Sequence, residues 1–111
     1  MADPIEDLKL RLRQFARARD WDQYHTPKNL AMALSVEASE LAEIFQWLTP
    51  EEASALPPDK LAHAAEEISD VLLYLVRLAD RLNVDVLAAA HAKMRKNALK
   101  YPANPDASKL G

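Results

Sequence analysis

Several residue types are missing or scarce, and each absence excludes a class of site. The 111-residue chain has no cysteine and a single glycine, Gly111. Without cysteine there are no disulfides, thiolate zinc sites or cysteine nucleophiles. Phosphate-binding loops of the Walker and dinucleotide types need internal glycines for tight turns and close backbone approach. If this protein handles phosphates, it must therefore use side chains and metal ions.

Excess positive charge and long apolar runs are absent as well. Acidic residues outnumber basic ones 17 to 14, a net charge of −3, which argues against non-specific nucleic-acid binding. The longest apolar run, Val71 to Val76, is far shorter than the ~18 residues of a membrane span. The charged N-terminal segment shows no secretory signal. We expect a cytoplasmic protein with no nucleic-acid or membrane partner.

Prolines and capping residues divide the chain into helices, and no strand-like alternation appears. The helices are predicted at about 3–20, 26–48, 59–82 and 85–100, with a short turn of helix after Thr49 and a break at Asn83. This pattern predicts an all-α, four-to-five-helix bundle in one domain, residues 1–101, followed by a loose tail, 102–111. The core of one such chain is thin, which favours association into a dimer or a larger bundle.

Acidic residues interrupt the apolar stripes of two predicted helices. On the second helix, Glu37 occupies a position in the core stripe and Glu40 interrupts the neighbouring row. On the third helix, Glu67 lies in an apolar row and Asp70 follows one turn later. A carboxylate in such a setting costs several kcal/mol unless it is paired, protonated or bound to metal.

Three interpretations of these acids remain open from the pattern alone: a metal site, buried ion pairs, or misjudged helix faces. Arg77 and Arg81 follow Asp70, but no basic residue flanks Glu37. Oxygen-only clusters suit Mg²⁺ or Mn²⁺, especially where substrate phosphates complete the coordination. Such clusters recur in in-line displacement at phosphorus.

The last helix and the aromatic residues each allow a functional and a structural interpretation. The polar face formed by Lys93, Lys96, Asn97 and Lys100 either contacts a polyphosphate or is a solvated face at the negative end of the helix dipole. The tryptophans, Trp21 and Trp47, either stack on a base or belong to the core. His25 is either a site residue or a structural turn residue beside the Thr26 cap.

The motifs together resemble a known family. Trp21-x-x-Tyr24-His25-x-Pro27-Lys28-Asn29-Leu30, Glu37-x-x-Glu40-Leu41-x-Glu43-Ile44-Phe45-Gln46-Trp47, Glu66-Glu67-x-Ser69-Asp70-Val71-Leu72-x-Tyr74-Leu75 and Lys93-Met94-x-x-Asn97 follow in the order of the MazG-like all-α nucleotide pyrophosphohydrolases. The resemblance spans roughly residues 8 to 102 and is greatest to the dCTP pyrophosphatase branch.

The resemblance implies Mg²⁺-dependent hydrolysis of a (deoxy)nucleoside triphosphate, dCTP or a modified dCTP, to the monophosphate and pyrophosphate. Mn²⁺ is a possible substitute. Four residues would be catalytic and bind the metal: Glu37, Glu40, Glu67 and Asp70. One of them, or a hydroxide on the metal, would activate the attacking water. The substrate-binding residues would be Trp21, His25, Trp47, Tyr74, Lys93, Lys96, Asn97 and Lys100. The resemblance also implies a homodimer or homotetramer with sites shared between subunits.

One residue departs from the dCTP-specific pattern. Those relatives carry a histidine on the first helix, where this chain has Leu12, which cannot donate a hydrogen bond. Since base selectivity depends on satisfied polar contacts, the base preference stays open. The alternatives are a pyrophosphohydrolase for dUTP, phosphoribosyl-ATP or damaged dNTPs, and a non-catalytic helical binding module in which Glu37 and Glu67 pair with arginines.

Overall fold

The computed structural model describes residues 3–104, and all regular elements in that range are helices. The helices are α1 (Pro4–Ala18), α2 (Pro27–Phe45), α3 (Pro50–Ala53), α4 (Pro58–Arg81) and α5 (Val86–Lys100). The all-α prediction is confirmed, and each predicted helix lies within a few residues of an observed one.

Local chemistry explains where the helices begin and end. Pro4, Pro27 and Pro50 each start a helix, and the residue before each one accepts a hydrogen bond from a backbone N–H of the first turn. The breaks after α1 and α4 fall at Asp20 and Asn83, with φ of 58° and 56°. These short polar residues tolerate the left-handed conformation that ends a helix.

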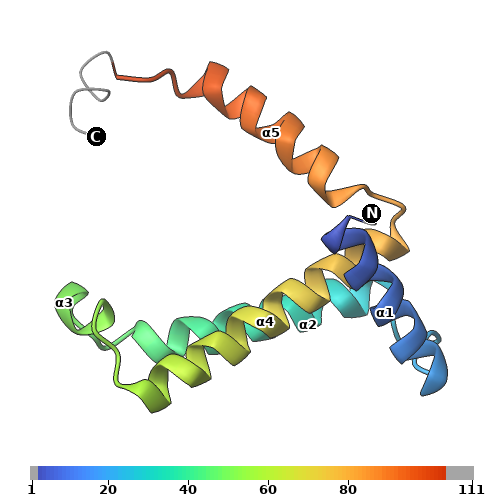
Figure 1. Cartoon of the computed structure of the whole chain (residues 1–111), viewed down its shortest axis with the longest axis horizontal. Helices are drawn as coiled ribbons and strands as arrows, with labels where there is room; N and C mark the ends of the chain where they lie inside the picture. The colour runs from blue at the N-terminus through green and yellow to red at the C-terminus, as the bar shows by residue number, and fades with distance from the viewer. Residues whose placement is uncertain (1–2, 105–111) are drawn as a thin grey trace.

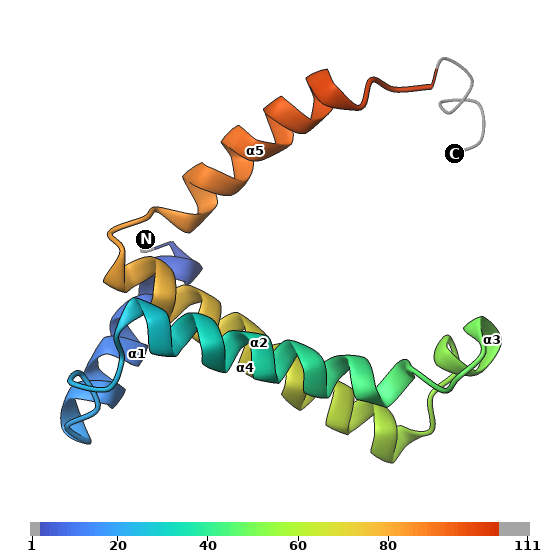
Figure 2. The ribbon, with the colours of Figure 1, turned by 180° about the vertical axis from the view of Figure 1, so that it is seen from behind.

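Helices α2 and α4 form the body of the molecule. They run antiparallel along most of their length, and α1 packs across the C-terminal end of α4 (Figure 1). Seen from behind, α5 again extends away from this body (Figure 2). The buried apolar core of the described residues is correspondingly small: Ala16, Leu30, Ala64, Val76 and Ala79. One chain therefore does not close into a bundle by itself.

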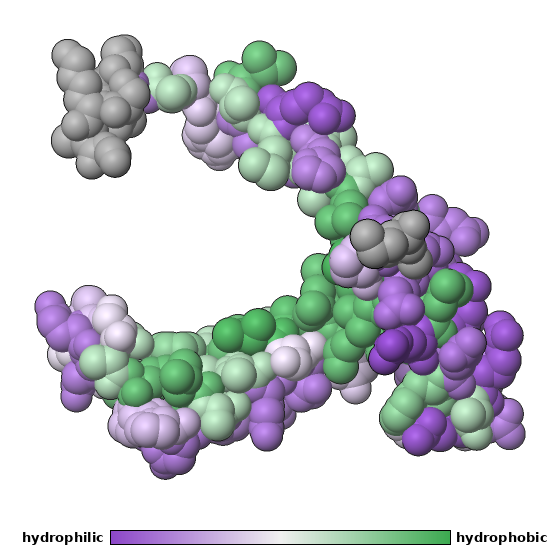
Figure 3. All heavy atoms as spheres, viewed as in Figure 1, coloured by the Kyte–Doolittle hydropathy of each residue, from purple (hydrophilic) through white to green (hydrophobic). Residues whose placement is uncertain are grey.

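Much apolar surface stays exposed on the single chain. The space-filling view shows apolar residues along the face of the α2–α4 body that looks toward α5 (Figure 3). On α4 the exposed apolar residues share one helical stripe: Leu61, Ile68, Leu72 and Leu75. On α5, Met94 and Leu99 are 68% and 86% exposed. Contiguous apolar patches of this kind mark association surfaces.

The predictions of a loose tail, a single domain and a cytoplasmic location are mostly not tested by the described residues. Most of the predicted tail, residues 105–111, lies outside the described residues, and Pro102 to Asn104 form no helix. The single domain over 1–101 stays a prediction. Among the described helices, none combines the length and apolar character that crossing a bilayer requires. The cytoplasmic location stays a prediction too.

Candidate metal and nucleotide site

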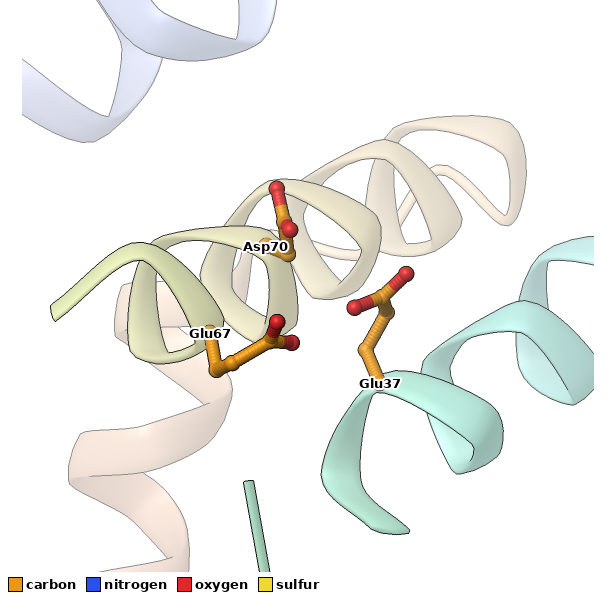
Figure 4. Close-up of side chains that lie close together, drawn as sticks. All are labelled: Glu37, Glu67 and Asp70. Carbon is orange, nitrogen blue, oxygen red and sulfur yellow. The ribbon is translucent and has the colours of Figure 1, made fainter. Parts of the chain in front are cut away.

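Three carboxylates from two helices meet where α2 packs on α4. Glu37 extends from α2 toward Glu67 and Asp70 of α4 (Figure 4). One oxygen of each carboxylate lies within 4.8 Å of the others. The three-residue spacing of Glu67 and Asp70 places both on one face of α4. The cluster is the kind of oxygen-donor group that holds a hard divalent cation.

Two buried oxygens in this cluster have no hydrogen-bond partner among the described residues. They are Oε2 of Glu37 and Oε2 of Glu67, and Glu67 is only 9% exposed. The other oxygen of Glu67 has a neighbour, His63, whose Nε2 lies 3.4 Å away. An orphaned buried carboxylate oxygen carries a desolvation cost that a bound cation would remove.

The electrostatics of the cluster favour a positive occupant. Burial, followed by the neighbouring carboxyls of Glu67, Glu40 and Asp70, raises the pKa of Glu37 from 4.5 to about 7. The closeness of these acids would also favour metal binding, because a divalent cation neutralises their mutual repulsion.

The interpretation as buried ion pairs does not hold for the cluster. Arg77, the arginine that follows Asp70 on α4, is 4% exposed and instead pairs with Asp22 and Asp80. No ion pair with arginine or lysine occurs at Glu37 or Glu67 in residues 3–104.

The fourth predicted ligand, Glu40, lies beside the cluster but outside the group of three. It is exposed, and it lines an open cleft of about 460 Å³ together with Glu43, Ile44, Lys60, His63 and Glu67. The row that Glu40 interrupts is half-buried at Ala33 and Ile44 and exposed elsewhere on the single chain. Val36 and Trp47, from the same row, are 56% and 86% exposed. Its role as a ligand stays a prediction.

An apolar recess adjoins the cluster at Asp70. It has a volume of about 160 Å³ and is lined by Leu12, Phe15, Ala16, Trp21, His25, Asp70, Leu73, Tyr74 and Arg77. The rings of Phe15 and Trp21 meet edge to face, with centroids 5.6 Å apart. Three predicted substrate-binding residues, Trp21, His25 and Tyr74, thus come together beside Asp70. A flat, apolar-walled space next to a cation site can take the base of a nucleotide.

The other predicted substrate-binding residues lie elsewhere. Trp21 precedes α2 and Trp47 follows it, and the 19 residues of α2 rise about 28 Å. One chain therefore does not bring both tryptophans to the same base. Helix α5 extends away from the α2–α4 body (Figure 1), and it carries the predicted phosphate-binding residues: Lys93, Lys96, Asn97 and Lys100.

An ion-pair network behind the recess was not predicted from the sequence. Arg77 contacts three partners on the turn before α2 and on α4 itself: Asp22, His25 and Asp80. Arg13 of α1 adds a bidentate contact to Asp80, with distances of 2.6 and 3.1 Å. Only the three-residue spacing of Arg77 and Asp80 was visible in the sequence. The partners from α1 and the turn come together through the fold.

Comparisons with known proteins agree with this geometry. The family model described as "MazG-like family" matches residues 32–109. The chain is 47% identical over 100 residues to dCTP pyrophosphatase 1 of Mus musculus, covering 88% of this chain and 59% of that protein. For dCTP pyrophosphatase 1 of Homo sapiens the identity is 46% over 102 residues, covering 90% and 60%.

A solved structure gives the fold independently. The crystal structure of a pyrophosphatase from Archaeoglobus fulgidus superposes with a TM-score of 0.86 at 41% identity, covering 93% of this chain and 96% of that one. The chain belongs to the MazG-like family. It spans about three fifths of the length of the mammalian relatives that it matches.

Proposed function

We propose that this protein is a Mg²⁺-dependent nucleotide pyrophosphohydrolase that cleaves dCTP, or a modified dCTP, to the monophosphate and pyrophosphate. The observation that carries the proposal is the cluster of Glu37, Glu67 and Asp70 with its two orphaned buried oxygens. The names of the mammalian relatives and of the archaeal structure support the reaction and the base.

The residues present fit a magnesium site. All of the candidate ligands are carboxylates, which Mg²⁺ prefers, with Mn²⁺ as a possible substitute. Glu37, Glu67 and Asp70 would hold the metal, and Glu40 would join them from the cleft beside Glu67. When bound, the metal would supply charge neutralisation on the phosphates and a lower pKa for the attacking water. A carboxylate of this group would accept the proton of that water.

The base would enter the recess that borders Asp70. Its aromatic walls, Phe15, Trp21 and Tyr74, suit stacking against a flat ring. Asp70 belongs to both the cluster and the recess, so phosphates at the cluster and a base in the recess can belong to one nucleotide. Leu12 lines the recess without offering a hydrogen bond. Recognition of cytosine would therefore rest on other polar groups than in the dCTP-specific pattern.

The complete site would need a second copy of the chain, in a homodimer or homotetramer. Trp47 is 86% exposed at the far end of α2, and α5 extends away from the cluster of its own chain. Pairing two α2–α4 bodies through their exposed apolar stripes would build a four-helix core. Trp47 of one copy would then close the recess of another. The polar face of α5 would reach phosphates across that interface: Lys93, Lys96, Asn97 and Lys100.

A panel of nucleotides tests the proposal. Pyrophosphate release is measured from dNTPs, NTPs and 5-modified dCTP, with Mg²⁺ and with a chelator. We expect Mg²⁺-dependent release that is greatest with dCTP and is lost in Glu40→Gln. Turnover of dUTP or another nucleotide instead would keep the reaction and change the substrate. If the chain turns over none of these nucleotides, and Mg²⁺ does not change its melting temperature, the protein would be a helical binding module.

A further inference from the structure

The buried guanidinium of Arg77 lies at the edge of the recess, next to His25. Arg77 is 4% exposed, and each of its three side-chain nitrogens has a partner. Nη1 donates to Asp80 at 3.2 Å, Nη2 donates to Asp22 at 2.8 Å, and Nε donates to Nδ1 of His25 at 3.1 Å. Because a guanidinium is planar and rigid, three contacts in three directions leave it one position.

The contact with His25 determines where the imidazole proton lies. Arginine is always a donor, so Nδ1 of His25 must be the acceptor, with its lone pair toward Nε of Arg77. A neutral imidazole carries its single proton on the other nitrogen, here Nε2. The neutral ring is favoured, because burial and the Arg77 charge, in that order, lower the pKa of His25, and Asp22 opposes this only partly.

His25 is also a wall of the recess, whose lining is mostly apolar or aromatic. The two charged residues there are Asp70, a carboxylate that accepts, and Arg77, whose side-chain nitrogens each already have a partner. Its ring packs against Trp21, with centroids 5.8 Å apart. A pyrimidine base has ring-nitrogen and carbonyl acceptors that lose their water in such a space and need a donor there. Leu12, on the same recess, offers none.

We infer that Arg77 is a positioning residue, which holds His25 in the Nε2–H tautomer so that the ring donates one hydrogen bond to an acceptor atom of the substrate's base. This inference rests on the proposed function and adds the polar group through which the base is recognised. Without Arg77, the proton is free to move to Nδ1, and the Nε2 atom becomes an acceptor that repels the acceptor of the base.

The network around Arg77 supports this positioning role. Asp80 is held by Arg13 of α1 as well as by Arg77, and its side chain is 8% exposed. Asn29 of α2 donates from Nδ2 to the carbonyl of Tyr24 at 2.9 Å, which restrains the same turn that carries His25. His25, which is restrained both by Arg77 and by the turn that carries it, would therefore be preorganised to donate its hydrogen bond.

The tautomer is tested first, by NMR on the full chain labelled with ¹⁵N at its three histidines. His25 is assigned from the spectrum of His25→Gln. We expect Nδ1 of His25 to be unprotonated and Nε2 to carry the proton in the unaltered chain, and a tautomer mixture in Arg77→Lys. A proton on Nδ1 of the unaltered chain would overturn the inference whatever the activity of the enzyme.

The consequence for the base is tested by a double-mutant cycle. The measured quantity is kcat/KM for dCTP divided by kcat/KM for 2-deoxyribose 5-triphosphate, which has no base. Arg77→Lys keeps the charge but loses Nε–H, and we expect the ratio to fall roughly 5- to 10-fold, as for one lost hydrogen bond. In a His25→Gln background the same change should leave the ratio unaltered, because an amide has no tautomer to fix.

A control and two opposite outcomes complete the design. Arg81→Lys, on the exposed side of α4, should leave the ratio unchanged. An equal fall of the ratio in both backgrounds would show that Arg77 supports the turn only, and would overturn the inference while the proposed function stands. Absence of turnover by the unaltered chain would instead overturn the proposed function before any variant is compared.

Discussion

Changing Glu37 to glutamine removes one ionisable group from the carboxylate cluster and keeps its size. Burial and the neighbouring acids raise the pKa of Glu37 from 4.5 to about 7. Between these values the folded chain holds a proton that the unfolded chain has lost. The free energy of unfolding therefore falls as the pH rises through this window, and the penalty is complete above about pH 7. Glutamine at this position carries no such penalty.

The size of the effect follows from the size of the pKa shift. A rise from 4.5 to about 7 corresponds to about 3 kcal/mol, at about 1.4 kcal/mol for each pKa unit. Glu37 is half-buried, and solvent screening reduces the value, so we expect about 1 to 2 kcal/mol. At pH 8 and without metal, the free energy of unfolding of Glu37→Gln should then exceed that of the unaltered chain by this amount. Each kcal/mol corresponds to a rise of about 4 to 8 °C in Tm. At pH 5 the advantage should be small.

Urea and thermal unfolding at pH 5 and pH 8, in a chelator and in millimolar Mg²⁺, measure these differences. Mg²⁺ should stabilise the unaltered chain at pH 8 and should stabilise Glu37→Gln much less, because one ligand is lost. Glu66→Gln, an exposed acid on α4, is the matched control and should change neither quantity. The reasoning is refuted if Glu37→Gln gains no stability at pH 8, or gains the same amount at pH 5.

Substitutions at three further positions test other parts of the structure. Trp47→Ala should raise KM for dCTP, because this side chain, 86% exposed on the single chain, would close the recess of another copy; an unchanged KM would remove Trp47 from the site. Asp80→Asn should cost about 2 to 3 kcal/mol in urea unfolding at pH 7, because Arg13 and Arg77 lose their shared counter-charge. The hydrogen bond from Arg13 lowers the pKa of Asp80, so this difference should disappear as the pH falls below the ordinary range of an aspartate, and a constant difference would contradict the ion pair. Asn83→Ala should lower Tm by an amount equivalent to about 1 kcal/mol and Asn83→Gly should not, because φ at this position is 56°; equal effects would contradict the left-handed turn.

The helix boundaries and part of the candidate carboxylate cluster could be predicted, because their signals in the sequence are local. Proline after a capping residue marks the starts of α1, α2 and α3, and Asn83 marks the break before α5. Glu37 stood out because a carboxylate in an apolar stripe is costly, and its Oε2 atom is indeed buried without a partner among the described residues. Such signals need no knowledge of how the helices pack.

The rest could not be predicted because it depends on distances between helices. Glu40 lies one turn from Glu37, and helical periodicity does not decide which of two neighbouring rows faces α4; the structure leaves Glu40 exposed. The Arg77 network joins residues more than fifty positions apart, Asp22 and His25 to α4, and no spacing in the sequence indicates it. The separation of Trp21 from Trp47 likewise follows from the length of α2.

The position of bond cleavage tests the central claim most directly. The full chain is incubated with dCTP and Mg²⁺ in ¹⁸O-labelled water, and the products are identified by ³¹P NMR and mass spectrometry. The account predicts dCMP and pyrophosphate in equal amounts, with one ¹⁸O atom in whichever product contains the phosphorus that water attacks, and no product in Glu67→Gln. Formation of dCDP and orthophosphate, or undiminished turnover by Glu67→Gln, would contradict it.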